Sequence, residues 1–279
     1  MFYCFDDVVR FCRVFRGLPV DVSEELRGWR WFDYPVVSSS SVRLGVSDIA
    51  GGFCDSGRFV YLKYVLRVKQ PRVVERVALG SFIHRIYSEI VRVAKKSIYM
   101  CDCLDKCGFR SIFESHKGEV FEKVYEEFKG LRRDVALKVF NQLWDYGLNV
   151  YCSAFEKVKS MSPYLRVDGA ASLIVSLVTE FPIDGSLIGL TKAIRVDGFL
   201  PPSIIVELKT RELKPVYNVA LAAYAMAFES QYEVPVNYGV LVNLRFSRNY
   251  SSFKVYEKIV KINDSLRQEF IDLRDKMAR

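Results

Sequence analysis

The sequence predicts an α+β fold in which a mainly helical N-terminal region precedes a mixed β-sheet flanked by helices. Two long stretches of the first part, 75–98 and 117–160, carry apolar residues at helical spacing. After Pro163 the pattern changes to runs rich in β-branched residues, separated by glycine or proline, which is typical of strands. The change predicts two regions, residues 1–160 and residues 161–279.

The N-terminal region is expected to begin with two short helices. The first covers Asp7–Phe15, and the second, which carries its own capping residues, lies within 41–54 after a run of four serines. An amphipathic helix over 75–98 follows. The long helical stretch 117–160 contains the segment "GLNVYC", residues 147–152, where we expect the helix to be interrupted.

The C-terminal region has the element order of a β-meander followed by a helix and further strands. Its last helix is expected to start at Asp264, with Asn263 or Asp264 as the N-cap. The expected strands cover 165–185, 186–202, 203–210, 237–246 and 251–262, with a helix over 216–230 after the third.

Composition limits the class of partner. The chain of 279 residues carries a net charge of +8, which favours nucleic acid as a polyanionic partner. No apolar run reaches the roughly 18 residues of a membrane span, and the N-terminus mixes acids and bases, so we expect an intracellular, cytoplasmic protein without membrane attachment. There, the seven cysteines are expected to bind metal, pack in the core or react rather than form disulfides.

The stretch "IIVELKT", residues 204–210, carries the main site hypothesis. Glu207 and Lys209 point to the same face of a strand because side chains alternate. Asp197 precedes Glu207 by ten residues, a spacing that allows a hairpin to bring the two carboxylates together. We expect Mg²⁺ or Mn²⁺ to bind there, with the backbone carbonyl of Leu208 as a further ligand, while the lysine polarises the attacking water. A solvated surface ion pair is the alternative.

A β-meander followed by a helix and one more strand is the core order of restriction-endonuclease-like nucleases, whose site motif is written PD-(D/E)xK. The tetrapeptide "RVDG" occurs twice, so Asp168 competes with Asp197, but a whole hairpin separates Asp168 from Glu207. Asp184 is expected to be a turn residue. His84 lies on the helix over 75–98 and is either a core side chain or a third metal ligand, since imidazole also binds Mn²⁺.

The segments "LGSFIHRIYSEI", "IRVDGF", "IIVELKT" and "YNVALAAYAMAFES", in that order, resemble the four motifs of RecB-like nucleases. More closely, nearly the whole chain resembles the CRISPR-associated exonucleases of the Cas-four type, in their archaeal type I-A variant, the Csa-one group. The resemblance implies metal-dependent cleavage of DNA that is single-stranded or has single-stranded overhangs. It also implies prespacer processing during CRISPR adaptation, together with the integrase and its partner subunits.

The motif residues of that family can be placed on this chain. The family's Gln-x3-Tyr motif falls on Ala220 and Tyr224, so the glutamine is missing, which concerns exonuclease strength or polarity rather than the metal site. The catalytic set implied by the resemblance is His84, Asp197, Glu207, Lys209 and Tyr224, of which the first three are the metal ligands. For Tyr224 the alternative is a helix aromatic that only packs on the sheet.

The resemblance further implies an iron-sulfur cluster held by one upstream cysteine and three near the C-terminus. Cys54 matches the upstream position, but no cysteine follows Cys152. The segment "CDCLDKC" offers Cys101, Cys103 and Cys107 instead, so we expect a 4Fe-4S cluster on these four cysteines, with zinc as the alternative metal. Cys152 is the reserve ligand. The other cysteines, Cys4 and Cys12, are expected to be small buried apolar residues, as is Cys152 if it binds no metal.

Contacts with DNA are expected from four basic residues, although such side chains commonly form a solvated helix face. Two other classes of function remain open. In one, the protein is a non-catalytic scaffold that binds DNA and the integrase, which the missing glutamine favours; in the other, it is a redox-sensing cysteine protein. The basic residues in question are Arg58, Lys63, Arg85 and Arg195.

Overall fold

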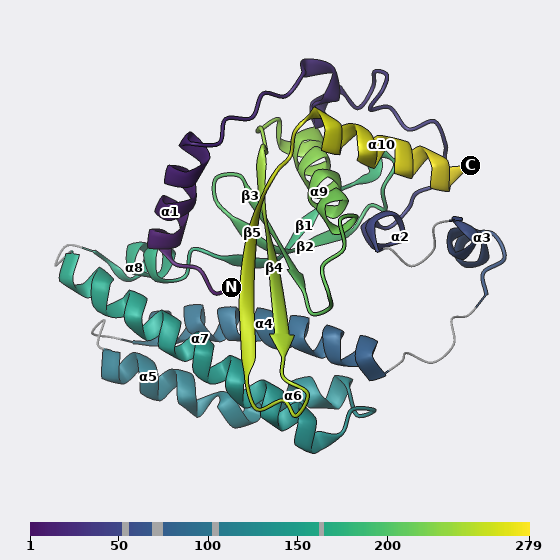
Figure 1. Cartoon of the computed structure of the whole chain (residues 1–279). Coiled ribbons are helices and arrows are strands. Elements are labelled where there is room, and N and C mark those ends of the chain that lie inside the picture. The colour runs from purple at the N-terminus through teal and green to yellow at the C-terminus, as the bar shows by residue number, and fades with distance from the viewer. Residues whose placement is uncertain (52–55, 69–74, 102–105, 162–164) are drawn as a thin grey trace. The chain divides into compact units, whose positions relative to one another are not determined.

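A computed structural model describes residues 1–51, 56–68, 75–101, 106–161 and 165–279 of the chain. The architecture is α+β, with a helical N-terminal half followed by a five-stranded mixed sheet and its flanking helices (Figure 1). The described residues form two compact units. The helical unit contains residues 1–17, 73–179 and 244–255, and the sheet unit contains residues 18–72, 180–243 and 256–279.

The helical unit is built around two long helices, α4 (Glu75–Met100) and α7 (Arg133–Met161), which pack directly on each other. Their apolar stripes meet aromatic rings from the shorter helices, including Phe113, whose ring centroid lies 4.5 Å from that of Trp144. Burial of such rings supplies most of the driving force for helix packing. The remaining helices of this unit are α1 (Phe5–Arg16), α5 (Lys106–Ser115), α6 (Lys117–Glu127) and α8 (Val167–Ile174).

Helix α7 runs without interruption through "GLNVYC", so the expected break there is wrong. The long helical stretch is divided earlier, between Glu127 and Arg133, around Gly130. Gly147 serves packing instead of a turn, because a Cβ at that position would lie 2.5 Å from Cγ2 of Ile90 on α4. Glycine therefore allows the two helices to approach closely.

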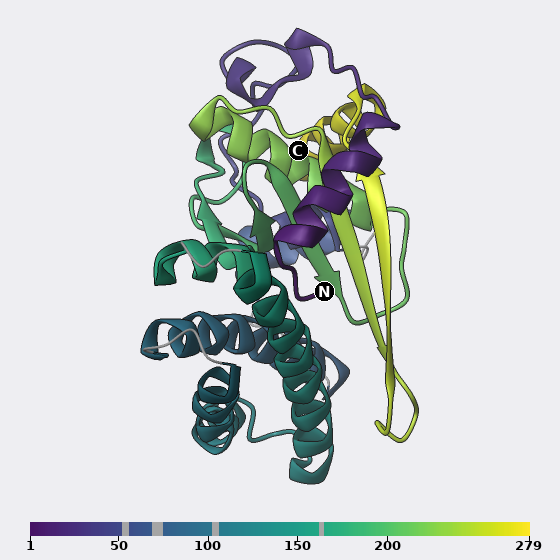
Figure 2. The same ribbon diagram turned by 90° about the vertical axis from the view of Figure 1, so that its left-hand side faces the viewer.

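The sheet has the strand order β1-β2-β3-β4-β5. Strands β2 (Ile194–Leu200) and β3 (Ile204–Lys209) are antiparallel, whereas β3 and β4 (Tyr238–Phe246) are parallel. The parallel pair is joined by α9 (Tyr217–Tyr232), as such a crossover requires. Strand β1 (Val178–Ile183) lies at one edge, and β5 (Phe253–Lys261) pairs with β4 in the long hairpin that Figure 2 shows.

Helix α9 is the central helix of the sheet unit, and nearly all of its side chains are buried. Phe228 on this helix stacks at 5.1 Å on Phe199 of β2, so α9 covers the face of β2 that also carries Asp197. The outer side of α9 contacts α10 (Asp264–Ala278), α2 (Val46–Ala50) and the short turn Gly28–Arg30. At that turn a Cβ on Gly28 would meet the carbonyl oxygen of Met226 at 2.0 Å, so only glycine fits.

A buried ion-pair network links α9 to α10 and to residues 27–28. Arg267 and Glu229 are both fully buried, and two nitrogens of the arginine donate to the carboxylate at 2.6 and 2.8 Å. Arg27 also pairs with Glu229 at 2.9 Å, and the backbone N–H of Gly28 donates to the same carboxylate at 2.9 Å. Residues 18–72 thus belong to the sheet unit, whereas the sequence predicts a single division after residue 160.

Most other expected elements are present, with one exception. The sequence predicts that residues 167–174 begin a strand, but they form α8, in which Asp168 occupies the first turn and Ala170 and Ala171 are buried. Two adjacent alanines favour a helix over a strand, which explains the outcome. Asn263 is the N-cap of α10, since its side chain accepts a hydrogen bond from the N–H of Leu266 at 3.2 Å. No helix in the described ranges is long and apolar enough to cross a membrane.

Candidate active site

The structure brings Asp197 and Glu207 together on neighbouring strands. The antiparallel register pairs Gly198 with Val206, so one step further along the strands Asp197 lies opposite Glu207. Oδ2 of Asp197 accepts a hydrogen bond from the backbone N–H of Leu208 at 2.8 Å. This bond fixes the aspartate against β3 at the point where regular pairing of the strands ends.

Lys209 completes the cluster as the sequence predicts. Its Nζ donates to Oε1 of Glu207 at 2.6 Å, and the glutamate is only 5% exposed. Burial lowers the pKa of Lys209, but the charge and hydrogen bond of Glu207, together with the charge of Asp197, outweigh it and raise that pKa above its ordinary value. The lysine is therefore a fixed ammonium at neutral pH.

Two further residues hold Lys209 in place, and the sequence motifs did not identify them. The ring of Tyr217, the first residue of α9, lies with its centroid 5.0 Å from the ammonium nitrogen, a distance at which cation–π attraction acts. Asn243 of β4 pairs in register with Lys209, and its amide donates to the carbonyl oxygens of Lys209 and Arg211 at 3.0 and 2.6 Å. Only strand register and helix docking reveal these roles.

Tyr224 lies on the face of α9 that is turned toward the carboxylates. Burial, followed by the negative charges of Glu207 and Asp197, raises the pKa of Tyr224 well above its ordinary value. The phenol stays protonated and can donate a hydrogen bond. Ala220, which stands where the Gln-x3-Tyr motif has its glutamine, is buried one turn before it and carries no polar group.

The donors of this cluster suit a hard divalent cation. Carboxylate and carbonyl oxygens are preferred by Mg²⁺ and Mn²⁺, and Mg²⁺ is commonly held by one or two carboxylates while water completes its shell. Among the residues that the structure describes, no group of three or more His, Cys, Asp or Glu side chains is arranged to hold a metal ion. Asp197 and Glu207 are the two carboxylates of the cluster that could hold such a cation.

Comparison with known proteins assigns the family. A family model described as CRISPR-associated exonuclease Csa1 matches residues 1–279. A protein of that description from Saccharolobus solfataricus is 35% identical over 277 residues, which covers 99% of this chain and 90% of the relative. The chain belongs to the Csa1 family of CRISPR-associated exonucleases. A second Csa1 protein, from Thermoproteus tenax, is 28% identical over 268 residues, which covers 96% of this chain and 86% of the relative.

Membership of the Csa1 family confirms the resemblance found in the sequence and indicates a nuclease that acts on nucleic acid.

The other candidate residues lie on other elements of the chain. The competing aspartate, Asp168, lies on α8 and accepts a hydrogen bond from the hydroxyl of Tyr99 at 2.7 Å. Asp184 is a turn residue, since its carboxylate accepts from the N–H of Ser186 at 2.9 Å. His84 lies half-buried on α4, in the helical unit, and its role as a metal ligand stays a prediction.

The basic residues predicted to contact DNA differ in their surroundings. Arg58, the first residue of α3 (Arg58–Tyr64), is exposed. The other three form ion pairs: Lys63 with Asp48 at 2.8 Å, Arg85 with Glu127 at 3.2 Å, and Arg195 with Glu180 at 3.2 Å. A phosphate bound by one of these three would therefore lie next to a carboxylate that already pairs with the same cation.

The predicted cysteine metal site lies largely outside the described residues. Cys54, Cys103 and the side chain of Cys107 are not among them, whereas Cys101 is buried directly after α4. Cys152 is buried on α7 as expected, but Cys12 is exposed because it lies on the outer side of α1, so its assignment as a buried apolar residue is wrong.

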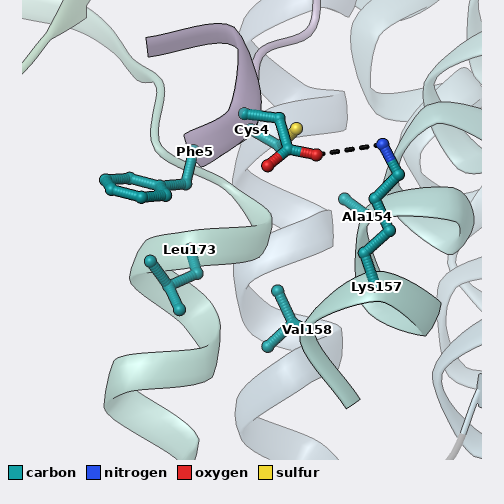
Figure 3. A pocket seen from close by; sticks show the side chains of 7 residues that line it. Cys4, Phe5, Ala154, Lys157, Val158 and Leu173 are labelled. Carbon is teal, nitrogen blue, oxygen red and sulfur yellow. Dashed lines mark hydrogen bonds and ion pairs between the residues drawn. The ribbon is translucent and has the colours of Figure 1, made fainter. Parts of the chain in front are cut away.

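Cys4 borders a small hollow of the helical unit, which Figure 3 shows. The hollow measures about 10 Å³, room for one water molecule. An ion pair of 2.9 Å between Lys157 and Asp6 closes its side. Burial and the neighbouring carboxylate of Asp7 raise the pKa of the Cys4 thiol, which disfavours the reactive thiolate that a redox-sensing cysteine needs.

Proposed function

We propose that this chain hydrolyses phosphodiester bonds of DNA in a restriction-endonuclease-like core that uses one or two Mg²⁺ or Mn²⁺ ions. The observation that supports it is the pairing of Asp197 with Glu207 across neighbouring strands, with the ammonium of Lys209 bonded to the glutamate. The substrate would be single-stranded DNA or DNA with single-stranded overhangs. The work would belong to CRISPR adaptation, as prespacer processing alongside the integrase and adaptation subunits.

The chemistry follows from charge and position. A divalent cation supplies Lewis acidity at the scissile phosphate and lowers the pKa of attacking water. Asp197 and Glu207 would hold that cation, and His84 would be a further ligand. Lys209, kept charged by its two carboxylate neighbours, would orient the water and stabilise negative charge that develops on the phosphorus oxygens. The protonated phenol of Tyr224 would donate a hydrogen bond near the same carboxylates.

The decisive experiment compares wild type with Glu207→Gln on end-labelled single-stranded DNA, in Mn²⁺, in Mg²⁺ and in EDTA. Loss of a carboxylate ligand should reduce metal-dependent cleavage by about a hundredfold or more, while the neutral amide keeps the side-chain volume. Glu269→Gln is the matched control, since Glu269 is exposed on α10. Equal cleavage by wild type and Glu207→Gln would refute the proposed site.

A scaffold function is the second candidate, and Ala220 is the observation that favours it. The experiment above separates the two candidates, because a scaffold would bind DNA and show no metal-dependent cleavage in wild type. Labels at the 5′ end and at the 3′ end, used in parallel, would also give the polarity of an exonuclease.

We also propose that Cys54, Cys101, Cys103 and Cys107 bind a 4Fe-4S cluster, with zinc as the alternative. Anaerobic purification followed by iron, sulfide and zinc analysis tests this directly. A cluster gives a brown sample with iron and sulfide in equal amounts, zinc gives a colourless one, and Cys101→Ser should lower the metal content in either case.

A further inference from the structure

A second concave site lies between α3 and the C-terminal end of α10, both of which belong to the sheet unit. Figure 1 shows α3 beside the end of α10. The pocket has a volume of about 210 Å³ and is lined only by residues from 42, 56–65 and 276–279. None of these residues belongs to the carboxylate cluster of β2 and β3. The pocket is therefore distinct from the candidate active site.

The charge of this pocket is one-sided. Arg58 approaches from α3, while Lys276 and Arg279 approach from the end of α10, and all three are exposed. None of the side chains that line the pocket is acidic. The carboxylate of Asp48 is occupied nearby, because it accepts hydrogen bonds from Lys63 at 2.8 Å and from Tyr64 at 2.6 Å. The charged side chains that line the pocket are therefore all cationic.

Aromatic and apolar groups complete the lining. Tyr61 is 53% exposed on α3 and lines the pocket next to the cations. The lining also includes the apolar side chains of Val60, Val65 and Met277. An exposed ring beside three cations offers a flat stacking surface together with charge. A ligand that combines a planar ring with a negative group matches both features.

Size narrows the ligand further. A volume of about 210 Å³ is below the roughly 300–1,000 Å³ of pockets for drug-sized molecules. It suits one planar ring system, with the attached anionic group at the mouth of the pocket among Arg58, Lys276 and Arg279.

We propose that the pocket between α3 and α10 binds one nucleotide unit of single-stranded DNA, with the base stacked on Tyr61 and the phosphates held by Arg58 and Lys276. Such pairing of a stacking ring with cations is how proteins bind single strands without sequence preference. The choice of DNA as the ligand rests on the proposed function, whereas the nucleotide chemistry rests on the pocket. It gives the substrate an anchor away from the bond that is cut.

The test is equilibrium binding of a fluorescent oligothymidylate to the full-length protein in EDTA, measured by anisotropy at several salt concentrations. The double variant Arg58→Ala/Lys276→Ala should weaken binding and lower the slope of log K against log salt by about 0.7 for each phosphate that is no longer neutralised. Tyr61→Ala should weaken binding by roughly fivefold or more, and Tyr61→Phe should bind as wild type does. The control is Lys258→Ala, an exposed lysine of β5 outside the pocket.

The outcomes separate this inference from the proposed function, because binding is measured in EDTA, where metal-dependent cleavage does not occur. Weaker binding by the pocket variants with unchanged binding by Lys258→Ala supports the pocket even if the protein cuts nothing. Unchanged affinity and unchanged salt slope in the pocket variants overturn the inference even if the protein is an active nuclease. Equal weakening by Lys258→Ala also overturns it, since it would show a diffuse charge effect. Thermal unfolding of each variant confirms that weaker binding does not come from unfolding.

Discussion

Replacement of Lys209 by methionine is the sharpest perturbation of the candidate site. Methionine keeps the length and the apolar stem of the side chain and removes the ammonium that lies 2.6 Å from Glu207. The change leaves the carboxylate of Glu207, which is 5% exposed, without its cation, and Asp197 remains opposite it. Both the stability of the sheet unit and the reaction should therefore change.

The expected magnitudes follow from burial. Loss of one partner from a buried ion pair costs about 3–5 kcal/mol. The side chain of Lys209 is 24% exposed, so solvent screening reduces the expected loss of unfolding free energy to about 2 kcal/mol. Loss of one fixed electrostatic group at a reacting centre slows reactions by about 10²–10³. Cleavage should fall by that factor while single-stranded DNA still binds.

Three measurements on one preparation check this reasoning. They are urea unfolding, initial cleavage rates in Mn²⁺ and DNA binding in EDTA, each for wild type, Lys209→Met and the control Lys258→Met at an exposed position of β5. Cleavage by Lys209→Met within threefold of wild type would refute the assigned role of the lysine. An equal loss of activity in Lys258→Met would show that general positive charge, not the fixed ammonium, matters.

Further predictions concern groups around the site and the helix packing. Tyr217→Phe should keep the cleavage rate within about twofold, whereas Tyr217→Ala should lower it by about fivefold or more, because only the former keeps a ring under the ammonium. Folding raises the pKa values of Lys209 and Tyr224 above their ordinary values of 10.5 and 10.0. The stability that these two groups contribute is therefore fully present below about pH 10 and is lost as the pH rises through their folded-state pKa values. The free energy of unfolding, obtained from thermal unfolding between about pH 9 and 11, should decrease less steeply with pH in Tyr224→Phe than in wild type, by up to about 1.4 kcal/mol per pH unit. An equally steep decrease in both proteins would contradict the raised pKa of Tyr224. In urea unfolding, Gly147→Ala should cost about 1–3 kcal/mol, because its Cβ would lie 2.5 Å from a side chain of α4, whereas Gly118→Ala, with nothing within 4 Å, should be neutral or stabilising.

The parts of the site that follow a strict pattern could be predicted from the sequence. Alternation along one strand places Glu207 and Lys209 on the same face, and a spacing of ten residues allows the hairpin that brings Asp197 next to Glu207. The same reasoning favoured Asp197 over Asp168 as the neighbour of Glu207, although the sequence did not reveal that Asp168 lies in the first turn of a helix. Local periodicity was therefore sufficient to predict the strands that carry the motif, but it did not predict the helix formed by residues 167–174.

The division of the chain could not be predicted, because it depends on contacts far apart in sequence. Glu229 belongs to no sequence motif, yet it is fully buried and binds Arg27 and Arg267. This network fastens residues 18–72 to α9 and α10, so the first third of the chain is split between the two units. Patterns of hydrophobicity identify which faces are buried and do not identify their partners.

The same limit applies to the missing glutamine at Ala220. Motif comparison treats this position as a loss, because it considers one helix at a time. In the folded chain Lys209 is supported by Tyr217, one turn before Ala220, and by Asn243, which fixes the backbone after β3 through two carbonyl oxygens. Neither residue belongs to a linear motif, since one acts through helix docking and the other through parallel strand register. The geometry of the lysine in this chain is thus specified by the tertiary structure, and Tyr217 and Asn243 are the positions at which loss of support should be measured before Ala220 is interpreted as a defect.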